Sequence, residues 1–163
     1  MLYLSVHQSP FYPGTGAARE VGEGEGRGFT VNVPLPARSA EDVYAAAFAG
    51  VFVPVLREFR PGLIIISAGY DAHAADLLGG MRLQAGSFRH FAAQLAAVVR
   101  EIEAAPLMLL LEGGYNLHAL TDSVAATIKG VEAEEPPGWE YLGDARPVEA
   151  ARRALAPFWG SLS

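Results

Sequence analysis

Two short, unbroken apolar runs limit what this chain can fold into more than any other feature of its sequence. They lie in LIIIS (63–67) and PLMLLLE (106–112), and each is closely followed by glycine. Apolar runs of this length, bounded by turn residues, are typical of strands that are buried on both faces in a parallel sheet. The composition agrees with such a core, because 51% of the residues are apolar and only 18% are charged.

The remaining segments alternate between strand and helix patterns. LYLSV (2–6) and FTVNVPLP (29–36) predict two more strands, the second stopped by Pro34 and Pro36. Helices are expected from Ser39 to about Phe59 with a kink at Pro54, from Ser87 through Ile102, from Leu117 through Ile128, and from Pro147 to Leu155. This alternation predicts an α/β layer fold with a mainly parallel sheet, formed as one domain by the 163 residues.

Composition and charge exclude several kinds of site. The formal net charge is -6, which does not favour binding of nucleic acid or other phosphates. The chain has no cysteine, so any metal must be held by His, Asp or Glu. We find no signal peptide and no apolar stretch of membrane-spanning length, so we expect a cytoplasmic protein without a membrane partner.

Chemically capable side chains follow the predicted strands. In open α/β sheets, ligands bind beyond the carboxyl ends of the strands, which directs attention to SAGYDAH (67–73) and EGGYN (112–116). Asp71 can bind a metal, hold a substrate ammonium or cap a turn. Alternation in an extended segment allows Asp71 and His73 to reach one side, but His73 can instead bond a neighbouring backbone group.

The other strand ends leave similar alternatives open. The hydroxyl of Tyr115, after two glycines, can donate a hydrogen bond to an oxyanion, or the ring can simply pack. Asn116 is a candidate cap for the next helix. FYPGTG (11–16) can form the wall of a narrow pocket or an ordinary turn, and His7 can line the same site. VGEGEGRG (21–28) is not a phosphate-binding loop, because it precedes a strand and lacks the required glycine register.

Four motifs in order make the sequence specific. SVHQSPFYPGTG, GRGFTVNVPLP, SAGYDAHAADLLGGMRL and LEGGYNL together resemble the zinc-dependent histone deacetylase superfamily, in particular its bacterial acetoin-utilisation and acetylpolyamine amidohydrolase branch. The resemblance covers residues 2–131, and the tail 132–163 matches no motif. It implies an arginase/deacetylase-like fold of three layers, in which helices sandwich a parallel sheet, with the site at the strand ends.

The resemblance also implies roles for individual residues. Asp71 is expected to be a ligand of a single Zn²⁺, and Tyr115 to donate a hydrogen bond to the substrate carbonyl and the tetrahedral oxyanion. His73 matches the motif but is not expected to be a ligand. The expected substrate is an acetylated lysine, a polyamine or a small acetyl-amine. The remaining implied residues line the acyl tunnel or hold structural monovalent cations such as K⁺: Tyr12, Leu78 and Gly114 for the tunnel, and Ser5, Val6 and Phe29 for the cations.

The family pattern needs more than these motifs contain. Its Asp-x-His zinc pair and its His-His dyad precede the strand that LYLSV matches. We therefore expect the C-terminal half of a deacetylase domain, truncated on its N-terminal side and inactive alone. Either a missing N-terminal half or a second chain would complete the site. The rival hypotheses are a catalytically inactive remnant or binding module, and an arginase-like binuclear metal enzyme, which the lack of Asp-rich motifs disfavours.

Overall fold

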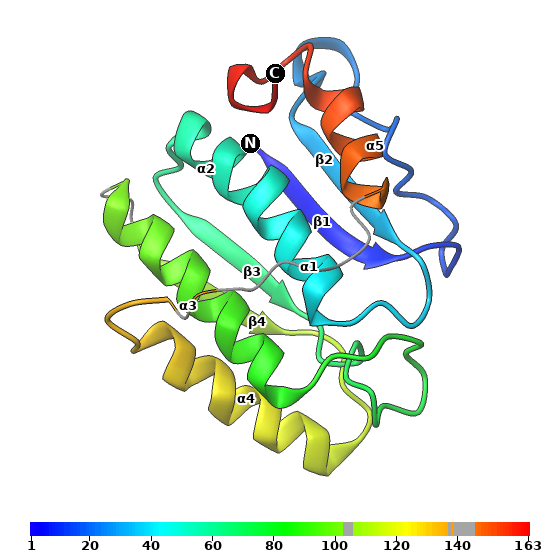
Figure 1. Cartoon of the computed structure of the whole chain (residues 1–163), viewed down its shortest axis with the longest axis vertical. Helices are drawn as coiled ribbons and strands as arrows, with labels where there is room; N and C mark the ends of the chain where they lie inside the picture. Colours follow the sequence, from blue (N-terminus) through cyan, green and yellow to red (C-terminus); the bar gives the residue numbers. More distant parts are fainter. Residues whose placement is uncertain (103–105, 137, 139–145) are drawn as a thin grey trace. The chain divides into compact units, whose positions relative to one another are not determined.

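The computed structural model describes residues 1–102, 106–136, 138 and 146–163. The chain forms two compact units. The first contains Met1–Phe59 and the C-terminal helix with the turn that follows it, and the second begins at Arg60. Each unit contains one pair of parallel strands with helices beside it (Figure 1). The α/β class and the parallel strand pairing predicted from the sequence are therefore confirmed, whereas the extent of the domain stays a prediction.

The first unit is built on strands β1 (Tyr3–Gln8) and β2 (Thr30–Leu35), which pair in parallel. The pairing places Ser5 beside Asn32 and His7 beside Pro34. Pro34 thus lies inside β2, and the expectation that it stops the strand is wrong. The strand ends at Leu35, before Pro36. A short 3-10 turn, η1 (Gly24–Gly26), lies in the long loop between the two strands.

A helical stretch follows β2 and reaches Phe59, as predicted. It consists of α1 (Glu41–Ala47), a π-helical segment η2 (Phe48–Phe52) and α2 (Val53–Phe59). The irregularity thus precedes Pro54, whose missing N–H interrupts the normal helical hydrogen-bond pattern. Ser39 does not cap the helix, because its hydroxyl donates to the carbonyl of Pro36 at 2.7 Å.

The tail forms part of the first unit's core. Helix α5 (Arg146–Leu155) is followed by a 3-10 turn, η3 (Gly160–Leu162). Leu155 is fully buried, and the indole N–H of Trp159 donates to the carbonyl of Gly28 at 2.9 Å. The predicted helix at 147–155 is confirmed, and this amphipathic segment stabilises the fold through its packing.

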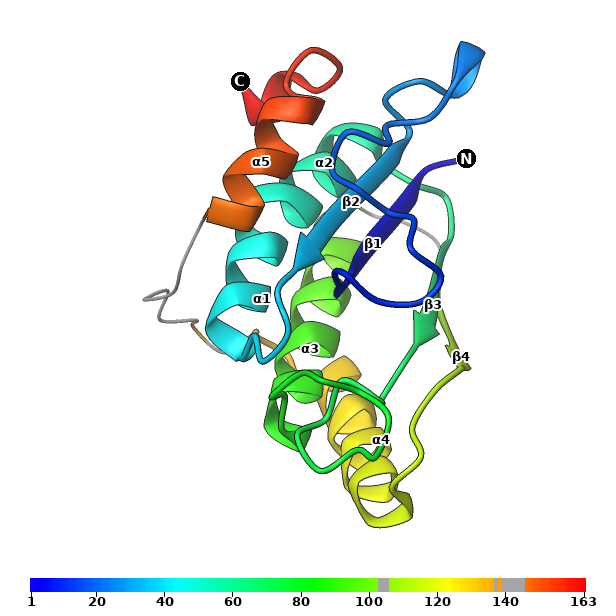
Figure 2. The same cartoon turned by 90° about the vertical axis from the view of Figure 1, so that its right-hand side faces the viewer.

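The second unit contains β3 (Ile64–Ala68), α3 (Ala85–Glu101), β4 (Leu107–Leu111) and α4 (Leu117–Val131). The two strands pair in parallel, and both helices lie on the same side of them (Figure 2). Helix α4 is capped as predicted, because the side-chain oxygen of Asn116 accepts the N–H of Ala119 at 3.1 Å.

The other side of the β3–β4 pair differs from the expectation. Both strands were predicted to be buried on both faces, but Ile65 is 55% exposed and its neighbour in β4, Met108, is 49% exposed. Leu63 and Leu110 are exposed as well. In the described part of this unit, helices cover one face of the strand pair, and apolar side chains on the other face are exposed.

Helix α4 also packs differently from its apolar pattern. The predicted stripe begins at Leu117, which is 76% exposed, and ends at Ile128, which is exposed too. The buried residues of α4 are small: Ala119, Ser123, Thr127 and Gly130. A β-carbon on Gly130 would lie 2.9 Å from the β-carbon of Ala92 in α3. The small face thus lets the two helices approach closely.

No helix in the described part of the chain is both long and apolar enough to span a membrane.

Candidate functional site

The segments that follow β3 and β4 lie against each other in the second unit. The N–H of Glu112 donates to the carbonyl of Ala68 at 3.1 Å, and the N–H of Tyr70 donates to the carbonyl of Gly113 at 2.9 Å. Parallel strands end at the same edge of their sheet, so SAGYDAH and EGGYN meet there. This brings together Asp71, Leu78, Gly114 and Tyr115, the predicted site residues of this unit.

Asp71 is half-buried, and its surroundings are shaped by glycine. A β-carbon on Gly113 would lie 2.7 Å from its Oδ2, and one on Gly69 would lie 3.2 Å from its Oδ1. A β-carbon on Gly79 would overlap the backbone carbonyl of Asp71. Burial raises the pKa of Asp71, and the negative charge of Asp76 raises it further, against the opposing effect of nearby backbone N–H groups. A cation nearby would stabilise the ionised form of such a carboxylate.

His73 does not join Asp71 as a paired ligand. Its Nδ1 accepts the N–H of Ala75 at 3.0 Å, and its own N–H donates to the carbonyl of Tyr70. Of the two arrangements that the sequence allowed, the structure has the one in which His73 bonds neighbouring backbone. The ring therefore helps to shape the turn after Asp71.

Tyr115 projects from the segment after β4 and is 54% exposed. Gly114, directly before it, has a φ of +135°, which favours glycine. A β-carbon at Gly114 would also lie 2.9 Å from Cδ1 of Leu120. Leu78 is exposed on the turn that follows Asp71. An exposed phenol and a half-buried carboxylate on neighbouring strand-end segments suit a reaction that needs a cation and a hydrogen-bond donor.

Asp76 is the residue of this site that the sequence did not single out. Its carboxylate accepts backbone N–H groups from both segments, including that of Tyr115 at 2.7 Å. Burial acts to raise the pKa of Asp76, but the donors Leu78, Tyr115, Gly79 and Asn116 outweigh it and lower the pKa. The only local signal is an aspartate shortly before a Gly-Gly pair, which is also how an ordinary turn looks.

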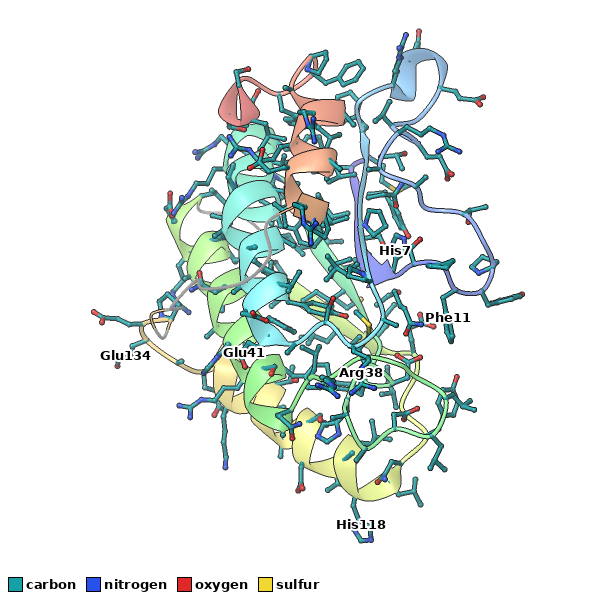
Figure 3. The ribbon with its side chains drawn as sticks, turned by 45° about the vertical axis from the view of Figure 1, so that its right-hand side comes forward. His7, Phe11, Arg38, Glu41, His118 and Glu134 are labelled. Atoms are coloured by element: carbon teal, nitrogen blue, oxygen red, sulfur yellow. The ribbon has the colours of Figure 1, made fainter. Side chains whose placement is uncertain are left out.

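In the first unit, His7 lies near the end of β1, and Phe11 lies in the loop that follows it (Figure 3). The hydroxyl of Ser5 bonds Nδ1 of His7 at 2.9 Å, and Nε2 of His7 bonds the carbonyl of Gly16 at 3.1 Å. Because a carbonyl oxygen only accepts hydrogen bonds, Nε2 is the donor in its bond with Gly16. His7 thereby ties the FYPGTG loop to β1. Tyr12, in that loop, is 91% exposed.

Phe29 belongs to an aromatic cluster. Its ring lies edge-on to Phe59 at 6.0 Å and to Trp159 at 5.7 Å between centroids. Its carbonyl accepts the N–H of Tyr3 at 2.9 Å. Packing thus accounts for Phe29, and the cation-binding roles of Ser5, Val6 and Phe29 stay predictions.

The fit to zinc is partial. Catalytic zinc takes three protein ligands and an open position. Within the described ranges, no three His, Asp or Glu side chains come together in a group that could hold a metal ion. Asp71 fits the role of one ligand, since it is a half-buried carboxylate in a space that glycines keep open. The described residues do not complete the set.

This chain is similar in sequence to known histone deacetylases. Residues 1–131 match the family model of the histone deacetylase domain. Histone deacetylase 10, chloroplastic, from Oryza sativa subsp. japonica is 42% identical over 134 residues, covering 82% of this chain and 30% of that protein. The histone deacetylase-like amidohydrolase of Pseudomonas aeruginosa is 38% identical over 117 residues, covering 71% of this chain and 31% of its own length.

Solved structures agree with the sequence comparison. The crystal structure of the HDA15 HD domain superposes with a TM-score of 0.86 at 34% identity, covering 99% of this chain and 45% of that one. This chain therefore spans less than half of the solved domain and about a third of the two curated relatives.

Proposed function

This chain belongs to the histone deacetylase family, and we propose that it contributes part of the catalytic site of a zinc-dependent deacetylase or amidohydrolase. The observation that carries the proposal is the meeting of the two strand-end segments, which brings the loop of Asp71 to the backbone of Tyr115. A metal-ligating carboxylate and a hydroxyl donor at one sheet edge suit amide hydrolysis.

Each residue has a defined part in this proposal. Asp71 supplies one carboxylate ligand to a zinc ion. When bound, zinc supplies a Lewis acid for the amide carbonyl and for water. The hydroxyl of Tyr115 donates a hydrogen bond to the substrate oxygen, where negative charge develops as the carbonyl is attacked. The substrate is an acetylated lysine, a polyamine or a small acetyl-amine, with Leu78 and Gly114 along its acyl group.

We further propose that the remaining zinc ligands and the proton-transferring histidines come from a polypeptide segment outside these 163 residues. The support is the absence of a three-ligand group among the described residues, together with the greater length of the matched relatives. That polypeptide is either an N-terminal half of the same domain or a second chain. Either one would also cover the open apolar face of β3 and β4.

A second candidate function is that of a catalytically inactive binding module of the same fold. It is favoured by the same single observation, that Asp71 has no partner ligands in the described part of the chain. In this case the chain keeps its packing and its strand-end segments but holds no zinc.

The test uses protein that is expressed from its own gene and promoter in its native host and then purified. We would measure its intact mass, its zinc content and its hydrolysis of acetyl-lysine and acetylpolyamine substrates. Tyr115→Phe is expected to lower kcat by about 100- to 1,000-fold with zinc retained, because one oxyanion donor is lost. Tyr3→Phe is a matched control, because Tyr3 is also 54% exposed but has no assigned part in the site, so loss of its hydroxyl should leave kcat close to that of the unmodified protein.

The outcomes separate the candidates. Zinc-dependent turnover that Tyr115→Phe lowers by the expected factor supports the deacetylase proposal. The intact mass shows whether the completing polypeptide is on the same chain. Equal turnover in both variants would refute the role of Tyr115. A protein without zinc and without hydrolysis would favour the binding module.

A further inference from the structure

The carboxylate of Asp76 joins two segments that are far apart in the sequence. Its Oδ1 accepts the N–H groups of Leu78 at 2.9 Å and Gly79 at 3.2 Å. Its Oδ2 accepts the N–H groups of Tyr115 at 2.7 Å and Asn116 at 3.3 Å, across 39 and 40 residues. One oxygen therefore closes the turn after Asp71, and the other holds the start of the segment that leads into α4.

A second contact runs between the same segments in the opposite direction. The side-chain nitrogen of Asn116 donates to the carbonyl of Ala75 at 2.9 Å. The side chain of Tyr115 itself is more than half exposed, so packing does little to fix it. The backbone of Tyr115, from which its hydroxyl projects, is held by Asp76. Hydrogen bonds to an ionised acceptor are among the stronger ones in proteins.

We infer that Asp76 is a positioning residue for Tyr115: its carboxylate holds the Tyr115 backbone against the turn that carries Asp71. The catalytic part of this inference rests on the proposed function, in which Tyr115 is the hydrogen-bond donor. The alternative is that Asp76 only closes its own turn, through Leu78 and Gly79. The two differ in which backbone N–H groups lose protection when the carboxylate is removed.

The first experiment needs no activity. Amide hydrogen exchange of the full chain, resolved by NMR, is compared for the unmodified protein, Asp76→Ala and Asp76→Asn. The Tyr115 and Asn116 amides should exchange about tenfold faster in both variants, since bonds to a charged acceptor are lost or weakened. The amides of α3 and α4 should keep their protection. Asp122→Asn removes the same charge from an exposed position of α4 and should change none of these rates.

Two variants keep this test decisive. Asp76→Asn preserves the shape of the side chain, but its amide nitrogen cannot accept a hydrogen bond, so it serves if Asp76→Ala does not fold. Exchange of the Tyr115 amide within about twofold of the unmodified rate in a folded variant would overturn the inference. Faster exchange confined to Leu78 and Gly79 would overturn it as well.

The second experiment uses the zinc-loaded protein from its native host. Asp76→Asn should lower kcat at least about tenfold with little change in KM, because a misplaced donor mainly affects the transition state. Adding Asp76→Asn to Tyr115→Phe should cost little more, since both act through one hydroxyl. Losses that multiply would contradict positioning through Tyr115. An unmodified protein without turnover would count against the proposed function, and the exchange result would still decide the role of Asp76.

Discussion

The space that Asp71 occupies exists because its glycine neighbours have no side chains. At Gly113, a β-carbon would lie 2.7 Å from Oδ2 and 2.9 Å from Cγ of Asp71, closer than van der Waals contact allows. The carboxylate can occupy its observed position only because this residue is glycine. Close approach, and not an unusual φ, is the requirement at Gly113.

We therefore predict that Gly113→Ala displaces the carboxylate of Asp71 and lowers the free energy of unfolding by about 1–3 kcal/mol, as overpacking does. Urea denaturation measures the loss, and the side-chain NMR signals of Asp71 report the displacement. Gly86→Ala is the matched control: Gly86 lies in α3 with open space around it, so alanine there should be neutral or slightly stabilising. Equal stabilities for the two variants would contradict the requirement for glycine at position 113.

The residues differed in how far the sequence could reveal their roles. The placement of Asp71 and Tyr115 just after paired strands could be predicted because both belong to motifs that follow apolar runs, whereas their chemical roles stay predictions. Asp76 belongs to the same motif as Asp71 but resembles a turn residue, and its contact with Tyr115 exists only once β3 and β4 pair. A contact between residues 39 positions apart produces no local pattern that can be seen in a single sequence.

Helix α2 and the C-terminal turn are held together by one exposed carboxylate. Glu58 accepts the N–H of Gly160 at 3.2 Å and the N–H of Ser161 at 2.9 Å. Hydrogen bonds from the side chain and then the backbone of Ser161 lower the pKa of Glu58, against a small effect of burial. A lowered pKa means that the stabilisation is present above the ordinary glutamate pKa and is lost as pH falls through the lower folded value.

We predict that η3 loosens from α2 in acid, below about pH 4, and that Glu58→Gln removes this step. Fluorescence of Trp159, in a Trp139→Phe background, follows the turn because its indole is buried beside Gly28. Glu25→Gln, an exposed change in η1, should keep the acid step. The prediction fails if Glu58→Gln and the unmodified protein show the same titration.

The helices and strands themselves were largely predictable, because apolar spacing is a local property of the sequence. The sequence was less informative about which face of a helix or strand is covered by the rest of the protein. The apolar stripe of α4 is exposed at Leu117 and Ile128, while small residues such as Ala119 make the contact with α3. Small side chains carry little apolar signal, yet they decide how closely two helices can pack.

The open apolar face of β3 and β4 is the feature of the whole chain that departs most from a self-sufficient protein. Ile65 and Met108 are neighbours across the strand pair, and both are about half exposed. Contiguous apolar patches of this kind mark surfaces that are covered by other polypeptide or that associate. The sequence predicted apolar strands, but it could not show that one face lacks a cover within these residues.

We predict that the isolated chain self-associates as its concentration rises, and that Ile65→Thr combined with Met108→Thr suppresses this association. Sedimentation velocity measures the association, and circular dichroism checks that the strands and helices persist. Leu77→Thr is the control, since Leu77 is an apolar residue with 78% exposure that lies outside the strand pair. Association that is unchanged in the double variant, or equally reduced by Leu77→Thr, would exclude this face as the cause.

The glycines around Asp71 also limit how this part of the chain can change by descent. Any amino-acid change that one base substitution can make in a glycine codon adds at least a β-carbon. At Gly69, Gly79 and Gly113 that carbon would meet Asp71 at its side chain or its backbone. At Gly79 and Gly113 the approach is so close that neighbouring atoms would have to shift, so a lineage that keeps the carboxylate in place is expected to keep these two glycines.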